Sequence, residues 1–404
     1  MNLFNELSFE TSSLLKKLPG IIDKVFPLPA RFRNKLKYDV AELSALFTSN
    51  RPEKKTSYLG KPNLLSAYLR YFLPWNVYRL CRLLPSLSIK LKNTDAVLDL
   101  GAGPLSFATA LWISRPDLRK LNLEFRCVDH TSAVMDTGKK ILYAMSAETD
   151  SSAKPGNWNI KTIQSEIQRT KLPLKIYGKP AAFVSAINFY NEIYWNYSPA
   201  DKTSLDRLAG SSANLLSSLC ADKGQILVVE PGIPRSGEFI SLLRGKMIEK
   251  GLGVLAPCPH EKECPYPGAK TLTKQKAKWC HFSFETESAP LQLKKLSEAS
   301  GLPKPRAVLN FLFAEKKPPI KQITQEQQNE GKKTFNQTFI NARVLSDAFP
   351  IGDNYARYCC SEIGTVLLTG SSETVGVLPS GSLAQVNITN KKDPKTGFVI
   401  AVLP

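Results

Sequence analysis

Three cysteines and two histidines lie within 24 residues of this chain: Cys258, His260, Cys264, Cys280 and His281. Such density is unusual for buried cysteines without a role, and in a reducing compartment clustered cysteines are typical metal ligands or reactive thiols. Lysines in and around the segment favour the thiolate, which is the form that binds metals. The pattern therefore predicts a metal site.

The residue types leave two kinds of metal centre open. Zinc would accept the three cysteines with His260 or His281, whereas a four-iron cluster requires four thiolates. The tail offers the pair Cys359-Cys360, and one of these would pin the tail to the rest of the chain. The other three cysteines, each isolated in apolar surroundings, are expected to be small buried hydrophobes: Cys81, Cys127 and Cys220.

A glycine turn is the second candidate site. An apolar run at residues 96–100 leads into Gly101-Ala102-Gly103, and a helix is expected over residues 107–113. The glycines let the backbone approach a ligand closely, and Asp99 at the end of the strand can accept hydrogen bonds from a ligand amine. Asp129 ends the next expected strand, where an acid can bind both hydroxyls of a ribose. The turn is a cradle for a nucleotide-type ligand.

Three interpretations of this turn compete: dinucleotide binding, S-adenosylmethionine binding, and a turn that binds nothing. The dinucleotide pattern G-x-G-x-x-G fails because Ser106 occupies the third glycine position. The form Asp-x-Gly-x-Gly instead resembles the first motif of the class I methyltransferases, and Glu230-Pro231-Gly232 fits that family too. Leu105 stands where a third small residue often follows, and we expect it to crowd the cofactor. Asn191-Glu192 occupies the region where such enzymes hold groups near the transferred methyl.

The elements that must position these residues alternate between short apolar runs and helical stretches. Strands are expected at residues 96–100, 124–128, 182–187 and 225–229, with 282–285 and 308–314 closing the sheet. This alternation predicts an α/β fold with a parallel sheet covered by helices. We expect a basic helical N-terminal region at 1–94, a methyltransferase-like α/β domain at 95–315 with a Cys-rich insertion at 256–282, a polar linker at 316–336, and a β-rich C-terminal domain at 337–404.

The composition indicates a folded protein that seeks polyanions. The 404 residues include 54 Lys or Arg against 35 Asp or Glu, a formal charge of +19, with 43% hydrophobic and 22% charged residues. These values exclude disordered, collagen-like and coiled-coil classes. Residues 1–94 alone hold 16 basic and 6 acidic residues. The run Arg31, Arg33, Lys35 and Lys37 is either a phosphate-binding surface, which we favour, or a solvated face.

Two further expectations concern location. The sequence has no apolar stretch approaching the ~20 residues of a membrane-spanning helix. The first residues lack the basic start and apolar run of a secretory signal, and Glu6 and Glu10 are unlike a mitochondrial presequence. We therefore expect a cytoplasmic protein with no membrane partner.

A more specific resemblance rests on four runs of sequence. They are Glu230-Pro231-Gly232-Ile233-Pro234-Arg235-Ser236-Gly237-Glu238-Phe239-Ile240, Ala256-Pro257-Cys258-Pro259-His260, Cys264-Pro265 and Trp279-Cys280-His281-Phe282. Over about residues 40–370 the chain resembles the mitochondrial small ribosomal subunit Rsm family of methyltransferase-like assembly factors, which also has bacterial members. The resemblance implies a Rossmann-like class I S-adenosylmethionine methyltransferase fold and association with the small ribosomal subunit and its rRNA.

The same resemblance implies site residues. Asp99, Gly101, Gly103 and Asp129 would hold S-adenosylmethionine. A 4Fe-4S cluster would be bound by Cys258, Cys264, Cys280 and Cys360, where Cys360 is chosen because it precedes Ser361-x-x-Gly364.

Three functions remain in competition. The first is a monomeric assembly factor that binds immature rRNA and has little or no enzymatic activity. The second is an active rRNA methyltransferase that brings a target base into the pocket. The third is a metal-sensing regulator of translation. Methyl transfer would separate the first two.

Overall fold

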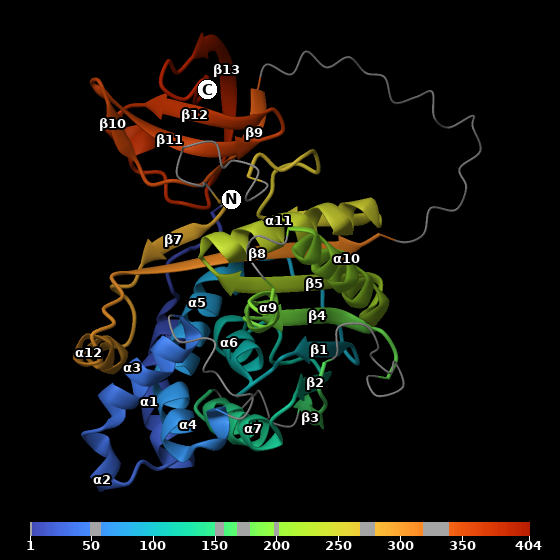
Figure 1. Cartoon of the computed structure of the whole chain (residues 1–404), viewed down its shortest axis with the longest axis vertical. Helices are drawn as coiled ribbons and strands as arrows, with labels where there is room; N and C mark the ends of the chain where they lie inside the picture. The colour runs from blue at the N-terminus through green and yellow to red at the C-terminus, as the bar shows by residue number, and fades with distance from the viewer. Residues whose placement is uncertain are drawn as a thin grey trace.

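The computed structural model describes residues 2–48, 58–149, 157–167, 178–197, 202–266, 279–317 and 339–404. In Figure 1 a mixed sheet with its helices forms the middle of the molecule, an N-terminal group of helices lies at one end, and a β-rich unit lies at the other. The expected linker at 316–336 falls almost entirely outside the described residues, so the proposed domain boundaries stay predictions.

Eight described strands form the central sheet, in the order β3-β2-β1-β4-β5-β8-β6, with β7 also pairing β8. The first five are parallel and β8 runs antiparallel to β5. This is the strand order of class I methyltransferases, so the predicted fold is confirmed. The strands are β1 (Ala96–Leu100), β2 (Leu123–Asp129), β3 (Trp158–Gln164), β4 (Ala181–Ile187), β5 (Cys220–Pro231), β6 (Leu252–Ala256), β7 (Phe282–Glu285) and β8 (Arg306–Lys316).

Helices cover both faces of this sheet. One face packs against α6 and α7 and against the N-terminal helices α1 (Phe9–Val25) and α5 (Leu73–Leu83), and the other packs against α9, α10 and α11. Alternate strand residues enter the two cores, as the period of two in a strand requires. The helices of this layer are α6 (Ser106–Ser114), α7 (Ser132–Ser146), α9 (Tyr190–Tyr194), α10 (Lys202–Leu219), α11 (Pro234–Glu249) and α12 (Leu291–Ala299).

The predicted helical N-terminal region is confirmed and shares the core of the sheet. Hydrogen bonds between residues far apart in the sequence join this region to α12 and β7. Trp75 Nε1 donates to Ser297 Oγ (3.1 Å), and Tyr78 O–H donates to the carbonyl of Glu285 (3.3 Å). A π-helical turn, η3, precedes Pro74 at the start of α5. The helices are α1 (Phe9–Val25), α2 (Ala30–Arg33), α3 (Leu36–Phe47), α4 (Pro62–Ala67), η3 (Tyr68–Phe72) and α5 (Leu73–Leu83), with short turns η2 (Tyr58–Gly60) and η4 (Leu84–Ser86).

The Cys-rich segment leaves and rejoins the sheet along one strand. It departs after β6, which ends with Ala256 opposite Phe313, and returns as β7, which begins with Phe282 opposite Leu309. These two points lie four positions apart on β8, roughly 14 Å along an antiparallel strand. The sheet therefore holds both ends of the segment at one edge.

The C-terminal residues form a closed, six-stranded β structure. Its order is β10-β11-β12-β14-β13-β9, and an additional pairing of β11 with β9 closes it into a barrel. β12 and β14 pair in parallel, and the other pairs are antiparallel. The elements are β9 (Phe339–Val344), β10 (Phe349–Ile351), β11 (Asn354–Ser361), β12 (Gly364–Gly370), the turn η9 (Ser372–Gly376), β13 (Leu383–Lys392) and β14 (Val399–Val402). The predicted β-rich C-terminal domain is confirmed.

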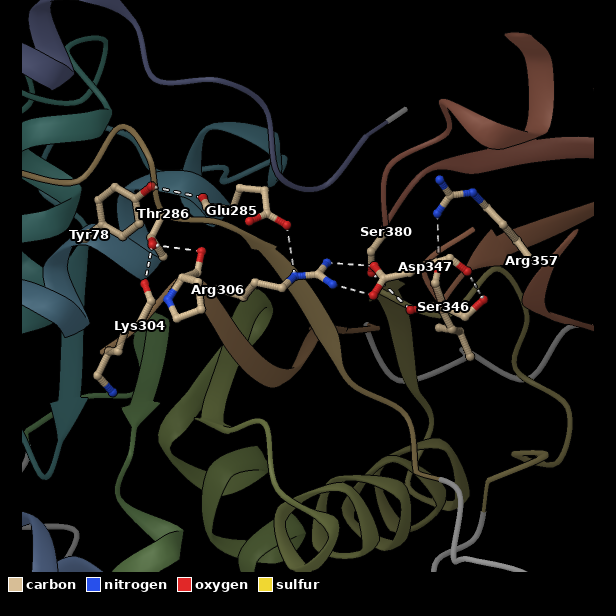
Figure 2. A network of polar contacts seen from close by, with 11 residues as sticks. Tyr78, Glu285, Thr286, Lys304, Arg306, Ser346, Asp347, Arg357 and Ser380 are labelled. Atoms are coloured by element: carbon tan, nitrogen blue, oxygen red, sulfur yellow. Dashed lines mark hydrogen bonds and ion pairs between the residues drawn. The ribbon is translucent and has the colours of Figure 1, made fainter. Parts of the chain in front are cut away.

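Polar contacts tie the barrel to the sheet layer. Figure 2 shows Arg306 of β8 between Glu285 of β7 and Asp347 of the barrel. Arg306 Nη2 donates to Asp347 Oδ1 at 2.7 Å, and Nη1 contacts the second carboxylate oxygen. The N-terminal residues also contact the barrel, because the N–H of Leu3 donates to the carbonyl of Gly381 (3.3 Å).

In the described ranges, none of the helices is both long and apolar enough to cross a membrane.

Candidate functional site

The glycine turn has the geometry of a ligand cradle. Gly101 and Gly103 have positive φ angles, +67° and +50°, which side chains with a Cβ rarely adopt. A Cβ built on Gly103 would meet no atom within 4 Å, so its outer side is open. At Gly101 the same Cβ would lie 2.6 Å from Cδ2 of Phe189, which closes that end of the turn.

Asp129 fixes the turn to the end of the neighbouring strand. Its Oδ2 accepts a hydrogen bond from the N–H of Gly103 (3.0 Å), and its Oδ1 accepts one from the N–H of Thr131 (3.0 Å). His130 Nδ1 lies 3.1 Å from Oδ1. Although burial acts in the other direction, these contacts hold the pKa of Asp129 below its usual value. The side chain is therefore a carboxylate with lone pairs directed at the turn.

Asp99 lies beneath the turn and is almost completely buried. Ser185 of β4 donates a hydrogen bond to its Oδ1 (2.7 Å). Burial raises its pKa to about 7, the serine opposes this, and the nearby Asp129 charge adds to it. A ligand ammonium group placed here would stabilise the ionised form.

The expectation that Leu105 crowds the cofactor is wrong. Leu105 is fully buried in the core that faces α6, and its own φ is +57°. The left-handed conformation turns the side chain into the core. Phe189, which follows β4, is the bulky side chain beside the turn.

Tyr68 of the N-terminal region joins this site, which the local sequence did not predict. Burial raises the pKa of its hydroxyl, and the negative charges of Glu192 and Asp129 raise it further. Tyr68 therefore lies within electrostatic reach of the acid from the fourth-strand loop and the acid from the second strand. Part of η3 thus lies on the same side of the molecule as these two acids.

Glu230 positions the loop that carries Asn191 and Glu192. This fully buried carboxylate accepts hydrogen bonds from the N–H groups of Tyr190 (2.8 Å) and Asn191 (3.0 Å), which belong to the first turn of α9, where the helix itself offers no acceptor. Burial raises its pKa to about 8, against the effect of these bonds. Glu230 is thus a structural group that holds the loop in place.

The segment that follows Glu230 contacts the Cys-rich segment at several points. Trp279 Nε1 donates to the carbonyl of Gly232 (3.2 Å), and a Cβ on Gly237 would lie 2.9 Å from Cβ of Trp279. About two turns further along the same helix, α11, Arg244 Nε donates to Sγ of Cys258 (3.2 Å). Helix α11 therefore packs against the Cys-rich segment through Trp279 and Cys258.

The four predicted metal-binding cysteines converge at the joint between the sheet layer and the barrel. Burial raises the pKa of Cys280, and Cys258, Cys360 and Cys264 raise it further. Burial likewise raises the pKa of Cys360, with additional effects from Cys258 and Cys264. Each sulfur is therefore within electrostatic reach of others from segments up to about a hundred residues away in the sequence.

The two tail cysteines point in opposite directions. Cys359 is fully buried in the barrel core, among Val344 and Val366. Cys360 lies on the outer face of β11, where its Sγ is 3.4 Å from Nε2 of His260. Alternation along a strand makes these orientations exclusive. Cys360 is the tail cysteine that faces the Cys-rich segment.

Two buried arginines add positive charge around the sulfurs. Arg244 also donates to the carbonyl of His260 (2.6 Å), and Arg343 donates to the carbonyls of Pro257 and Gly381 (both 2.8 Å). Burial lowers the pKa of Arg343 to about 10, and the thiols of Cys258, Cys360 and Cys280 act in the opposite direction. The sequence did not indicate either arginine as part of the site.

The candidate donors do not form a compact site for one ion. Among the described residues, no group of three or more His, Cys, Asp or Glu side chains is arranged to hold a metal ion. His281 stacks on Trp279 with ring centroids 4.8 Å apart, and its Nδ1 contacts the carbonyl of Trp279. His260 is the histidine beside the sulfurs.

Residues 203–325, less than half of the chain, match the family model described as "Mitochondrial small ribosomal subunit Rsm22", which confirms the resemblance stated from the sequence. Among curated protein sequences, none matches.

Several solved structures are similar at low sequence identity. One is a chain of the complex between the Haloferax volcanii Trm112 methyltransferase activator and the putative methyltransferase, with 11% identity, a TM-score of 0.29 and coverage of 60% of this chain and 90% of that chain. A geranyl diphosphate C-methyltransferase from Streptomyces coelicolor has 11% identity, a TM-score of 0.32 and coverage of 59% and 78%. A putative methyltransferase from Bacillus halodurans has 12% identity, a TM-score of 0.31 and coverage of 60% and 99%.

Proposed function

We propose that this chain is an assembly factor of the small ribosomal subunit that binds rRNA, uses a methyltransferase-like fold and carries a Cys-ligated 4Fe-4S cluster. The observation that carries the proposal is the family match over residues 203–325. That segment supplies Glu230, helix α11 and three of the four converging cysteines.

The donor set fits an iron–sulfur cluster better than zinc. Four cysteine sulfurs influence one another electrostatically, yet in the described part of the chain no three donors are arranged to hold one ion. A four-iron cluster holds its thiolates farther apart than one tetrahedral zinc ion does. The guanidinium groups of Arg244 and Arg343 would offset the negative charge of such a cluster. When bound, it would supply a covalent link between barrel and sheet.

Sedimentation tests the ribosomal part of the proposal. The purified chain is expected to co-sediment with immature small subunits in a sucrose gradient, and less with mature ones. Anaerobic purification followed by iron and sulfide analysis tests the cluster. A chain that sediments alone at every salt concentration would contradict the ribosomal role, whatever its metal content.

An active methyltransferase is the second candidate, and the open side of Gly103 with the carboxylate of Asp129 supports it. Asp99, Gly101, Gly103 and Asp129 would hold S-adenosylmethionine, with Asp129 binding the ribose. Transfer of labelled methyl groups to immature subunits would distinguish this candidate from an assembly factor that binds without turnover.

Replacing Asp129 by alanine is expected to weaken S-adenosylmethionine binding by roughly 1–3 kcal/mol, the usual range for a lost charged hydrogen bond. Calorimetry on the full chain measures this change. Asp136→Ala provides the matched control because Asp136 is an exposed acid on the neighbouring helix α7. Equal binding by the two variants, or no binding by the unmodified chain, would contradict the assignment.

Salt dependence tests the basic run of the N-terminal region. Arg31, Arg33, Lys35 and Lys37 are all exposed, on and beside α2. Their simultaneous replacement by glutamine is expected to reduce the slope of log affinity against log salt for duplex rRNA fragments by up to about 3–4, because each phosphate contact contributes about 0.9. An unchanged slope would identify the run as a solvated face.

A further inference from the structure

The C-terminal barrel has the strand order of a known fold when the short strand β10 is counted as part of the loop between β9 and β11. The remaining strands then follow the order 1-2-3-5-4-1, with β9 as strand 1 and β11 as strand 2. Strands 3 and 5, β12 and β14, are the parallel pair, and the turn η9 lies between strands 3 and 4. This is the Greek-key order of the OB-fold, whose outer face at strands 2 and 3 and whose loops 1–2 and 4–5 bind oligonucleotides or oligosaccharides.

The Cys-rich segment covers one end of that outer face. Cys360 of β11 lies beside His260, and opposite it on β12 is Thr365, which bonds the hydroxyl of Tyr266. The next outer residue along β11 is Tyr358, two positions from Cys360. The Cys-rich segment therefore covers the outer face as far as Cys360, and the uncovered part of the face starts at Tyr358.

Aromatic side chains cross the rest of the face. Phe349 of β10 packs against Tyr358 with ring centroids 5.0 Å apart, and Tyr358 packs against Phe398 at 5.8 Å. All three are half-buried, so each ring keeps exposed surface. Aromatic rings in a row are the groups on which successive unpaired bases stack.

Both loops beside these rings are held in place. In loop 1–2, the N–H of Tyr358 donates to Ser346 Oγ (2.8 Å), Arg357 donates to the Ser346 carbonyl (2.9 Å), and Arg306 clamps Asp347, as Figure 2 shows. In loop 4–5, Asp393 Oδ2 accepts the N–H of Thr396 (2.9 Å). Order before binding reduces the entropy lost on binding.

The positive charge beside these rings favours an oligonucleotide over an oligosaccharide as the ligand. Lys391, Lys392 and Lys395 are all exposed at and beside loop 4–5, next to Phe398. Lysines suit phosphates, whereas a neutral sugar gains nothing from them. We propose that the rings of Phe349, Tyr358 and Phe398 with these three lysines bind single-stranded RNA; the proposal rests on the ribosomal function above and assigns the barrel as its reader of unpaired rRNA.

The test uses the full chain and a fluorescein-labelled 12-nucleotide oligouridine, with a 12-base-pair RNA duplex for comparison. The triple variant Lys391→Gln, Lys392→Gln, Lys395→Gln is expected to weaken single-strand binding at least about tenfold and to lower its salt slope by about 2, at about 0.7 per contact. The matched control replaces three exposed lysines elsewhere, Lys92, Lys120 and Lys140, by glutamine and is expected to bind almost normally.

Stacking is tested separately. Phe398→Leu is expected to lose about tenfold in single-strand binding, the loss typical of one stacked base, while Tyr358→Phe keeps its ring and its affinity. If Phe398→Leu lowers the melting temperature, its loss of binding could come from unfolding, and the lysine variants alone then test RNA binding by the barrel. Equal losses in the two lysine triples, or an equal loss of duplex and single-strand binding in the barrel triple, would overturn the inference. Co-sedimentation with immature subunits tests the ribosomal function independently. A failure of that function can therefore be distinguished from a failure of the barrel to bind single-stranded RNA.

Discussion

Replacing Cys360 by serine is expected to reduce the iron and sulfide content of the anaerobically purified chain to near zero and to remove its broad visible absorption. Serine cannot supply the fourth thiolate that the cluster requires. Because the free energy of metal binding is also folding free energy, this variant should melt at a lower temperature. The loss should also weaken its hold on the ribosomal subunit, although no RNA contact is changed.

The adjacent residue provides the matched control. Cys359→Ser makes the same chemical change one position away, but in the barrel core. It buries a hydroxyl and should cost about 1–3 kcal/mol of stability while the iron content stays normal. Metal content, and not stability, therefore separates the two variants.

Release of the barrel can be followed at the N-terminus. The N–H of Leu3 donates to Gly381 of the barrel, so its peptide should exchange hydrogen faster in Cys360→Ser than in Cys359→Ser. Stoichiometric zinc without iron, retained by Cys360→Ser, would instead indicate a local zinc site that uses His260.

Local patterns were sufficient to predict the glycine turn and most of the central sheet. Asp99, Gly101 and Gly103 follow one buried strand and Asp129 ends the next, so parallel pairing alone brings them together. The sequence did not indicate β3 (Trp158–Gln164) and β6 (Leu252–Ala256). β3 is an edge strand with alternating apolar residues, and β6 is short and contains a glycine, so neither forms a continuous apolar run.

Long-range packing accounts for what the sequence left open. The choice between Cys359 and Cys360 depends on which face of β11 turns inward, and pairing with β9 and β12 sets that face. Tyr68 comes within electrostatic reach of Asp129 and Glu192 through the packing of a separate helical region, which no local spacing encodes. The closed order of the barrel likewise follows from pairings between strands distant in the sequence.

Replacing Gly138 by alanine is expected to destabilise the chain by about 3 kcal/mol or more, the upper part of the range for overpacking. A glycine in the middle of a helix normally costs about 1 kcal/mol relative to alanine. In α7 the close approach of the glycine turn requires it, because a Cβ there would lie 2.7 Å from Cα of Pro104 and closer to its carbonyl group. Backbone atoms cannot rotate away, so the helix or the turn must move.

The same substitution at Gly210 should change the stability in the opposite direction. Gly210 lies within α10, where a Cβ would meet no atom within 4 Å, so alanine should stabilise the chain by about 1 kcal/mol. Urea midpoints of both variants measure the difference, and calorimetry should show weaker S-adenosylmethionine binding for Gly138→Ala alone. A Gly138→Ala chain as stable as Gly210→Ala would mean that α7 does not support the turn, and the geometry assigned to Asp129 would then lose its basis.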